Sequence, residues 1–203
     1  FMTNKKKKIL VFSNGEKIGD GIIKLQLLHE IKTRLPNYKL YWLTNKGKTV
    51  YSSTLKFIAS NYIDEVLDQA ELSPFFWNKI SKRYNLQDES FDYILDTQKS
   101  VIRTVALKRI KHKNFISGSA NGLFSTKKIK NNRKRQYYLN YILDLLDLIV
   151  TTKRKSDFKI PISQNLDGLI SNILPKDKSY IGIAPGAGEK NKIWPLEKYI
   201  KLC

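Results

Sequence analysis

The feature that most constrains the fold is a strand–loop–helix–strand pattern near the start of the chain. An apolar run at residues 8–13, KILVFS, is followed by a polar loop and then by residues 22–35, where apolar side chains recur at helical spacing. Pro36 and Asn37 end this helical pattern, and residues 38–44, YKLYWLT, form a second strand-like run. Such a unit pairs its strands in parallel through a right-handed connection. The recurring apolar residues are Ile22, Leu25, Leu28, Ile31 and Leu35.

The alternation of strands and helices continues to about residue 150. Strands that alternate with helices favour an α/β fold with a doubly wound parallel sheet. We predict further helices at residues 49–60, 74–84, 100–111 and 136–150, strands at 91–98 and 113–119, and a short strand or turn at 63–68.

The alternation of strands and helices stops at residues 151–178, which are polar and contain Pro161 and Pro175. We interpret them as an interdomain connection with a short helix. Residues 180–185, YIGIAP, then predict a new strand, followed by a glycine-containing loop and the start of a helix. The sequence therefore indicates a Rossmann-like domain at 1–150, a linker at 151–178 and the beginning of a second domain at 179–203.

Composition restricts the environment of the protein. Cys203 is the one cysteine, so no disulfide can form within the chain, which fits a reducing compartment. No stretch approaches the roughly 18 apolar residues of a membrane helix. The apolar run at residues 9–12 is shorter than the core of a signal peptide, which has about 7–15 residues. We expect a cytoplasmic protein.

Lys and Arg outnumber Asp and Glu by 37 to 18, which gives a net charge of +19. This charge favours anionic partners, but we prefer AT-rich coding bias as the explanation, because Lys, Asn and Ile are abundant together. A nucleic-acid-binding protein is an alternative, but no RNA-binding, zinc-finger or helix-turn-helix motif is present, so we expect no specific nucleic acid. The basic cluster at residues 127–135 either meets phosphates or an anionic membrane leaflet, or is a solvated loop.

Two glycine-containing loops follow predicted strands, at the edge where parallel sheets bind ligands. In the second, APGAGEKNKIWP at residues 184–195, Gly186 and Gly188 let the backbone approach a ligand, and the helix start presents free amides to a phosphate. Lys190 and Lys192 add positive charge. Because the loop matches neither a Walker A motif nor G-x-G-x-x-G, a structural turn is an equal interpretation.

The first loop, SNGEKIGDG at residues 13–21, places Asp20 just before the helical pattern. Asp caps helix N-termini well, and a carboxylate at this edge could also act as a general base. Asp96 has the same two interpretations, because it follows a predicted strand and could cap the next helix or contact a ligand together with Gln98. Arg103, on that next helix, either faces the ligand or lies on the surface.

Four short segments, in this order along the chain, resemble glycosyltransferase family 9, the ADP-heptose:lipopolysaccharide heptosyltransferases. Members typically show Gly-Asp after the first strand, Asp-x-Gln after a later strand, and Pro-Gly-Ala/Ser followed by Lys-x-Trp-Pro where the second domain opens. The resemblance covers nearly the whole chain, with Lys99 and Ala184 standing where the family often has Gly and His. The matching segments are Gly19-Asp20, Asp96-Thr97-Gln98, Pro185-Gly186-Ala187 and Lys192-Ile193-Trp194-Pro195.

The resemblance implies a GT-B enzyme with two Rossmann-like domains, the first for the acceptor and the second for the nucleotide-sugar. It implies inverting transfer of a heptose or related sugar from an ADP-heptose-like donor to a phosphorylated lipid A or core oligosaccharide acceptor, with Asp20 as the base. No Asp-x-Asp metal pair precedes the cleft, so we expect no required metal or other cofactor. Donor phosphates would meet Gly186, Ala187, Gly188 and Lys192, and the acceptor would meet Gly19, Asp96, Gln98 and Arg103.

The basic cluster at residues 127–135 adds the expectation of a peripheral contact with the anionic inner face of the cytoplasmic membrane. Because family members run well beyond this chain, we expect it to hold the acceptor domain, the linker and only the beginning of a truncated donor domain, and to be inactive alone. A non-catalytic remnant of such an enzyme is the remaining alternative.

Overall fold

The structure is a computed structural model that describes residues 6–127, 137–154, 158–161, 164–186 and 192–202. The chain divides into two compact units, Phe1–Ile160 and Pro161–Cys203, which we describe separately. Within the described ranges, no helix combines the length and the apolar character that a membrane span requires.

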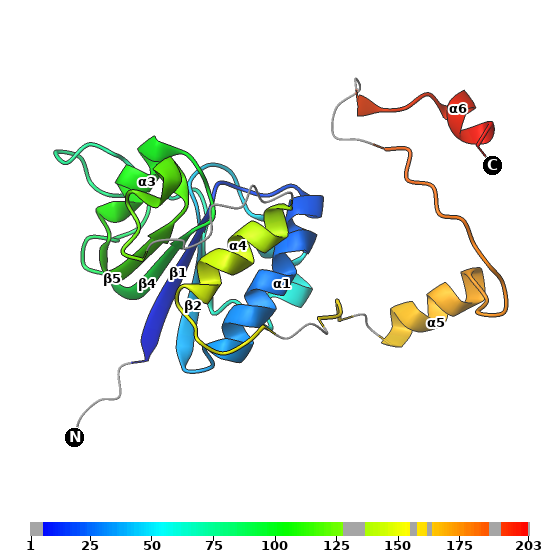
Figure 1. The fold of residues 1–203 in the computed structure, drawn as a ribbon, viewed down its shortest axis with the longest axis horizontal. Coiled ribbons are helices and arrows are strands. Elements are labelled where there is room, and N and C mark those ends of the chain that lie inside the picture. Colours follow the sequence, from blue (N-terminus) through cyan, green and yellow to red (C-terminus); the bar gives the residue numbers. More distant parts are fainter. Residues whose placement is uncertain (1–5, 128–136, 155–157, 162–163, 187–191, 203) are drawn as a thin grey trace. The chain divides into compact units, whose positions relative to one another are not determined.

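The first unit is built on a five-stranded sheet in the order β3-β2-β1-β4-β5, with every neighbouring pair parallel (Figure 1). The chain adds β2 and β3 on one side of β1 and then crosses to the other side for β4 and β5. The order of strands therefore reverses between β1 and β4, which pair along Ile9–Phe12. The strands are β1 Lys7–Ser13, β2 Tyr38–Thr44, β3 Glu65–Leu67, β4 Ser90–Asp96 and β5 Lys111–Ser117.

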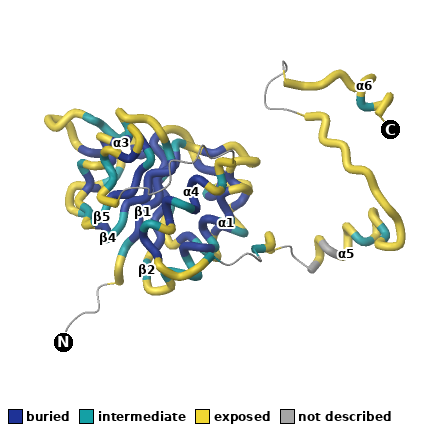
Figure 2. Tube along the Cα trace, in the orientation of Figure 1, coloured by how far each residue is buried: buried dark blue, intermediate teal, exposed yellow. Residues whose placement is uncertain are grey.

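Both faces of the sheet are covered, which explains why the central strands read as continuous apolar runs. Alternate residues of β1 belong to different cores: Ile9 and Val11 face one side, and Leu10 and Phe12 face the other. The tube in Figure 2 shows the strands and the inner sides of the helices as the buried part of this unit. Ile9, Leu10, Val11 and Phe12 are all fully buried.

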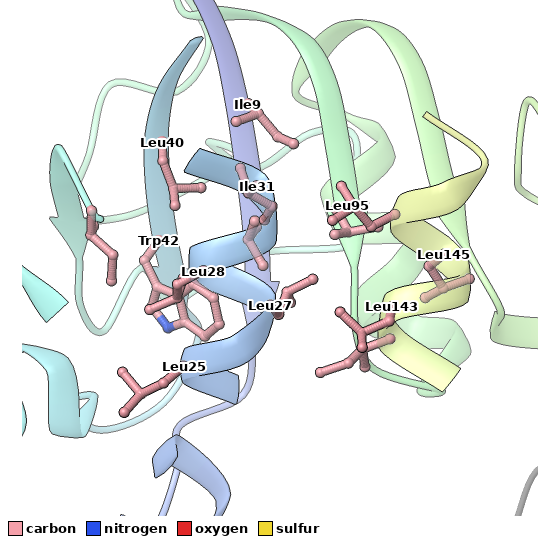
Figure 3. Close-up of a cluster of buried hydrophobic side chains, with 14 of the residues drawn as sticks. Ile9, Leu25, Leu27, Leu28, Ile31, Leu40, Trp42, Leu95, Leu143 and Leu145 are labelled. Atoms are coloured by element: carbon pink, nitrogen blue, oxygen red, sulfur yellow. The ribbon is translucent and has the colours of Figure 1, made fainter. Parts of the chain in front are cut away.

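The first face is covered by α1 (Ile18–Arg34) and α4 (Tyr138–Asp147), which lie side by side in Figure 1. Figure 3 shows this core, where α1 and α4 direct side chains such as Ile31 and Leu145 towards the strands. Arg34 joins the two helices, since its guanidinium donates hydrogen bonds to Asp147 Oδ1 at 2.8 Å and to the backbone oxygen of Val150 at 3.3 Å.

The second face is covered by α3 (Val101–Lys108), which contributes Leu107, and by residues of the long connection between β3 and β4. The short elements of this unit are η1 Val50–Ser52, α2 Lys56–Ala59 and η2 Ser119–Gly122. The predicted helix at 49–60 is therefore wrong in extent, because only two short pieces form there.

The predicted helix at 74–84 is wrong. Its backbone is engaged in other bonds: the Arg109 guanidinium binds the carbonyl oxygens of Ser73 and Asn78 at 2.6 and 2.5 Å. The Ser81 hydroxyl donates to the Ala70 carbonyl, which holds the end of the segment against the preceding loop. These contacts replace the hydrogen bonds of a helix.

The second unit contains α5 (Gln164–Ile173) and α6 (Leu196–Ile200). The short helix expected in the linker is therefore present. The strand predicted at 180–185 does not form in the structure: Ile181 is 86% exposed, and the described part of this unit holds no neighbouring strand. A strand needs such a neighbour to satisfy its backbone groups.

Candidate active site

The candidate site lies at the carboxyl edge of the sheet, where β1 and β4 end side by side. Thr97 joins the two ends, because its amide and its hydroxyl donate to the Phe12 carbonyl oxygen at 3.2 and 2.8 Å. The loops that follow β1 and β4 diverge from this point. In open parallel sheets, the place where the strand order reverses is the usual position of a ligand.

Asp20 lies at this edge in the first turn of α1, and its residue is exposed. The helix-cap interpretation is wrong, because the N-cap residue is Lys17, and the Gly21 amide bonds to the Lys17 carbonyl at 3.0 Å. The helix starts earlier than the apolar periodicity indicated, since Ile18 and Ile22 in its first turns face outward. An exposed carboxylate in a first helical turn interacts favourably with the helix dipole and is free to meet a ligand.

The start of α1 is fixed by close packing at Gly21. A Cβ at Gly21 would stand 2.4 Å from Cγ2 of Val50, so the backbone of α1 approaches η1 at a distance that only glycine allows. The Tyr51 hydroxyl donates to the Gly21 carbonyl oxygen at 2.8 Å. The close packing and the hydrogen bond at Gly21 therefore fix the position of the helical turn that carries Asp20.

A buried lysine lies one turn further along α1. Lys24 is 3% exposed, and its ammonium donates to Ser13 Oγ at 2.7 Å and to Glu16 Oε1 at 3.4 Å. Thr49 donates to the other oxygen of Glu16 at 2.5 Å. Burial lowers the pKa of Lys24, and the charges of Glu16 and Asp20 oppose that shift. This network ties the end of β1 to the β1–α1 loop and to η1.

The sequence analysis missed Lys24, although one signal was present. Lys24 shares a helical face with Leu28 and Ile31, which are fully buried. A basic residue on an otherwise apolar stripe must find a partner or leave the core. The nearest acid in the sequence is Asp20, but the closest contact of the ammonium in the structure is the Ser13 hydroxyl.

Tyr138 brings α4 to the same edge. Its hydroxyl donates to the Thr97 carbonyl oxygen at 3.5 Å, and the Lys24 ammonium lies 5.6 Å from its ring centroid. Burial raises the pKa of Tyr138, and the charges of Glu16 and Asp20 act in the same direction. Tyr138 is nevertheless 40% exposed, so it borders the site and does not fill the core under α4.

Asp96 is fully buried and accepts hydrogen bonds from three elements. Its Oδ1 accepts from the Gln98 amide at 2.9 Å, and its Oδ2 accepts from Thr104 Oγ1 at 2.7 Å and from Ser117 Oγ at 2.8 Å. Burial raises the pKa of Asp96, and these hydrogen bonds oppose the rise. The cap interpretation is wrong, because Ser100 is the N-cap residue of α3. The observed geometry is that of a carboxylate that holds the β4–α3 turn.

The other residues predicted for the acceptor lie around this turn and the start of α1. Gly19 is exposed in the first turn of α1, next to Asp20. Gln98 is half-buried, and its side-chain nitrogen Nε2 lies 3.4 Å from Thr97 Oγ1. Arg103 is half-buried in the first turn of α3, which starts at this edge. Gly19, Gln98 and Arg103 thus belong to the two loop-and-helix starts that flank the β1–β4 junction, and Asp96 is the last residue of β4.

The predicted donor loop belongs to the second unit. Gly186 is exposed, and a Cβ there would meet nothing within 4 Å. Lys192 is also exposed, shortly before α6, whose N-cap residue is Pro195. Ala187 and Gly188 lie outside the described residues, as does most of the basic cluster at 127–135. Among the side chains that the structure describes, no three of His, Cys, Asp and Glu gather in a group that could hold a metal ion.

Solved structures that this chain resembles include glycosyltransferases. A glycosyl transferase family 9 protein from Veillonella parvula matches with a TM-score of 0.60 and 17% identity, over 97% of this chain and 58% of that one. The E. coli heptosyltransferase WaaC with ADP-2-deoxy-2-fluoro heptose matches with a TM-score of 0.57 and 18% identity, over 96% and 64%. WaaC with ADP gives 0.58 and 18%, over 96% and 61%. The expected α/β fold of the GT-B type is confirmed.

The chain spans between 58% and 64% of the length of these structures. No curated protein matches it. The sequence model of the family described as Glycosyltransferase family 9 (heptosyltransferase) matches residues 80–203, which include the Asp-x-Gln segment and both segments of the predicted donor loop. With more than half of its length matched, the chain belongs to glycosyltransferase family 9.

Proposed function

We propose that this chain contributes the acceptor side of an inverting glycosyltransferase, with Asp20 as the general base. The observation that carries the proposal is the position of Asp20, exposed in the first turn of α1 beside the β1–β4 junction. A base must reach the hydroxyl whose proton it takes, and a carboxylate at the ligand-binding edge of the sheet can do so.

In this mechanism Asp20 accepts the proton of the acceptor hydroxyl while the hydroxyl oxygen attacks the anomeric carbon of the donor sugar. The bond from that carbon to the diphosphate breaks on the opposite side, and the electron pair leaves with the nucleoside diphosphate. The configuration at the anomeric carbon is therefore inverted. Holding the two substrates in line supplies a large part of the rate enhancement in such reactions.

The donor we propose is an ADP-heptose-like nucleotide-sugar. WaaC, which has the same fold, was solved with ADP and with ADP-2-deoxy-2-fluoro heptose. In this chain, the amides around Gly186, Ala187 and Gly188 and the ammonium of Lys192 would stabilise the negative charge that develops on the leaving diphosphate. This stabilisation takes the place of a divalent cation in the proposal.

The acceptor we propose is a phosphorylated lipid A or core oligosaccharide, bound by Gly19, Gln98 and Arg103. The buried Asp96 would act through the Gln98 amide that it binds. An acceptor of this kind is anchored in a bilayer, so we also propose that the protein is cytoplasmic and makes a peripheral contact with an anionic membrane leaflet. The net charge of +19 supports such a contact.

Isothermal titration of ADP, ADP-heptose and a phosphorylated acceptor mimic tests the assignment of the two sides. It should be done with the 203-residue chain and with the protein encoded by the complete reading frame. We expect both forms to bind the acceptor mimic, and only the longer one to bind nucleotide tightly and to turn over. Failure of the longer protein to bind either nucleotide would remove the proposed donor.

A substitution tests the base. Asp20→Asn in the complete protein should abolish sugar transfer without weakening nucleotide binding. Asp88→Asn is a matched control, because Asp88 is an exposed acid that precedes β4 at the opposite edge of the sheet. Turnover by Asp20→Asn close to that of Asp88→Asn would show that Asp20 is not the base.

A further inference from the structure

Three consecutive aromatic rings are exposed between β3 and β4. Phe75, Phe76 and Trp77 are 51%, 84% and 68% exposed, and we call them the aromatic loop. The rings touch one another: those of Phe75 and Trp77 are stacked with centroids 5.0 Å apart, and that of Phe76 meets Trp77 edge-on at 4.8 Å. Exposed apolar surface gathered in one place commonly marks an interaction site.

The aromatic loop is held in place by its backbone. The Arg109 guanidinium binds the carbonyl oxygens of Ser73 and Asn78 on either side of the rings, and it lies 3.4 Å from that of Phe76. The Ser73 amide donates to the Ile80 carbonyl at 3.0 Å, which closes the base of the loop. The rings are therefore presented outward by a fixed turn, and the turn projects beyond α3 in Figure 1.

The surroundings of the aromatic loop are basic. From Pro74 to Tyr84 the chain contains Lys79, Lys82 and Arg83 and no acidic residue, and all three are exposed. Lys79 and Lys82 also line a cavity of about 520 Å³ together with Phe75 and Lys46, which follows β2. Glu71 also lines this cavity, and its carboxylate lies 3.5 Å from the Lys82 ammonium.

We propose that the aromatic loop and its lysines dock the protein on an anionic lipid bilayer. Trp and other aromatic rings favour the headgroup level of a membrane, where an apolar body meets a polar boundary. Basic residues beside them are attracted to anionic lipids, and stable peripheral binding generally requires both contributions. An acidic protein surface without an apolar patch would match the lysines but would leave the three rings exposed to water.

The inference deepens the peripheral membrane contact of the proposed function by assigning its surface, and it does not depend on sugar transfer. Co-sedimentation with vesicles of phosphatidylethanolamine and phosphatidylglycerol is the direct measurement, with phosphatidylcholine vesicles as the neutral arm. We expect the chain to bind the anionic vesicles and to bind the neutral ones at least about tenfold more weakly.

Replacing the rings together, Phe75→Ser with Phe76→Ser and Trp77→Ser, should weaken binding to anionic vesicles at least about tenfold. Phe57→Ser is the matched control, because Phe57 is a single ring on α2 with 76% exposure. Lys79→Gln with Lys82→Gln should weaken binding roughly tenfold, whereas Lys39→Gln with Lys111→Gln, which changes the net charge equally, should not.

Tryptophan fluorescence keeps the test independent of whether the triple variant folds. Trp77 is 68% exposed, Trp194 is 41% exposed and Trp42 is fully buried, so a blue shift on adding anionic vesicles supports the proposal only if it disappears in Trp77→Phe, which keeps Trp194. Vesicle binding that is unchanged by ring removal would overturn the assigned surface but leave the membrane contact standing. Absence of vesicle binding by the chain, while the protein encoded by the complete reading frame still binds ADP, would overturn both and leave the proposed chemistry intact.

Discussion

The ammonium of Lys24, in the second turn of α1, donates a 2.7 Å hydrogen bond to the hydroxyl of Ser13, the last residue of β1. Lys24 is nearly fully buried, and so is its ionic partner Glu16. Through Ser13 and Glu16, the ammonium ties the last residue of the central strand and the β1–α1 loop to the helix that carries Asp20. Its contribution to stability and the consequences of other close contacts can be tested directly.

We expect Lys24→Met to lower the free energy of unfolding by about 3 kcal/mol, because Glu16 would keep its buried charge without an ammonium beside it. Adding Glu16→Gln should recover much of that loss, since the remaining pair is neutral. Urea unfolding followed by circular dichroism measures both. Lys17→Met is the control, because Lys17 is exposed at the N-cap of α1. Equal effects of the two lysine variants would contradict a role of the buried pair.

The buried carboxyl of Asp96 predicts a pH dependence of stability. Burial raises the pKa of Asp96 in the folded protein above its ordinary value of 3.8, so the folded state holds this proton more tightly than the unfolded state. The contribution of Asp96 to the free energy of unfolding is therefore greatest below pH 3.8 and falls as pH rises through the raised pKa. We therefore expect the free energy of unfolding of the wild type, relative to that of Asp96→Asn, to fall as pH rises from below 3.8 through the raised pKa. A constant difference would contradict the prediction.

The close approach at Gly21 predicts a steric cost for a single methyl group. Gly21→Ala should destabilise the protein by about 1–3 kcal/mol, because the new Cβ would overlap the Val50 side chain. Adding Val50→Ala should relieve part of the cost. Gly19→Ala, where a Cβ meets nothing within 4 Å, should change stability by less than about 1 kcal/mol. Thermal unfolding of the four proteins checks the order, and equal effects at the two glycines would refute it.

Loss of the Arg109 guanidinium should loosen the aromatic loop. Arg109→Met would leave the carbonyl oxygens of Ser73 and Asn78 without their donors, so amide hydrogen exchange in residues 73–80 should accelerate while the sheet stays protected. Lys111→Met, an exposed substitution two residues later, is the control. Protection of residues 73–80 that survives in Arg109→Met would show that the loop is held by other contacts.

The strands β1, β2 and β4 were predictable because each contains an apolar run that the sheet buries. The runs at β1, β2 and β4 were identified within a residue or two of their observed bounds, and the helices that cover them carry clear apolar stripes. Residues 74–84 misled the same reasoning. Their apolar side chains include Phe76 and Trp77, which face solvent, and periodicity alone does not distinguish such rings from a core-facing stripe.

The candidate site was predictable in position but not in its internal contacts. The carboxyl edge and the loops bearing Asp20 and Gln98 follow from the strand–helix pattern and the family segments. The network of Lys24, Glu16 and Thr49 does not, because its members come from three separate elements and meet only when η1 packs against α1. Asp96 was found at the right place, but its burial and its bond to Ser117 of β5 depend on the pairing of two strands.

The strand order has a consequence for synthesis on the ribosome. Among the five strands of the described sheet, β1, at the centre, is made before the others, and each later strand pairs with one that precedes it in the chain. β2 adds to β1, β3 to β2, β4 to β1 and β5 to β4. No strand has to wait for a partner still to be translated, so the sheet can grow outward in both directions while the polypeptide emerges.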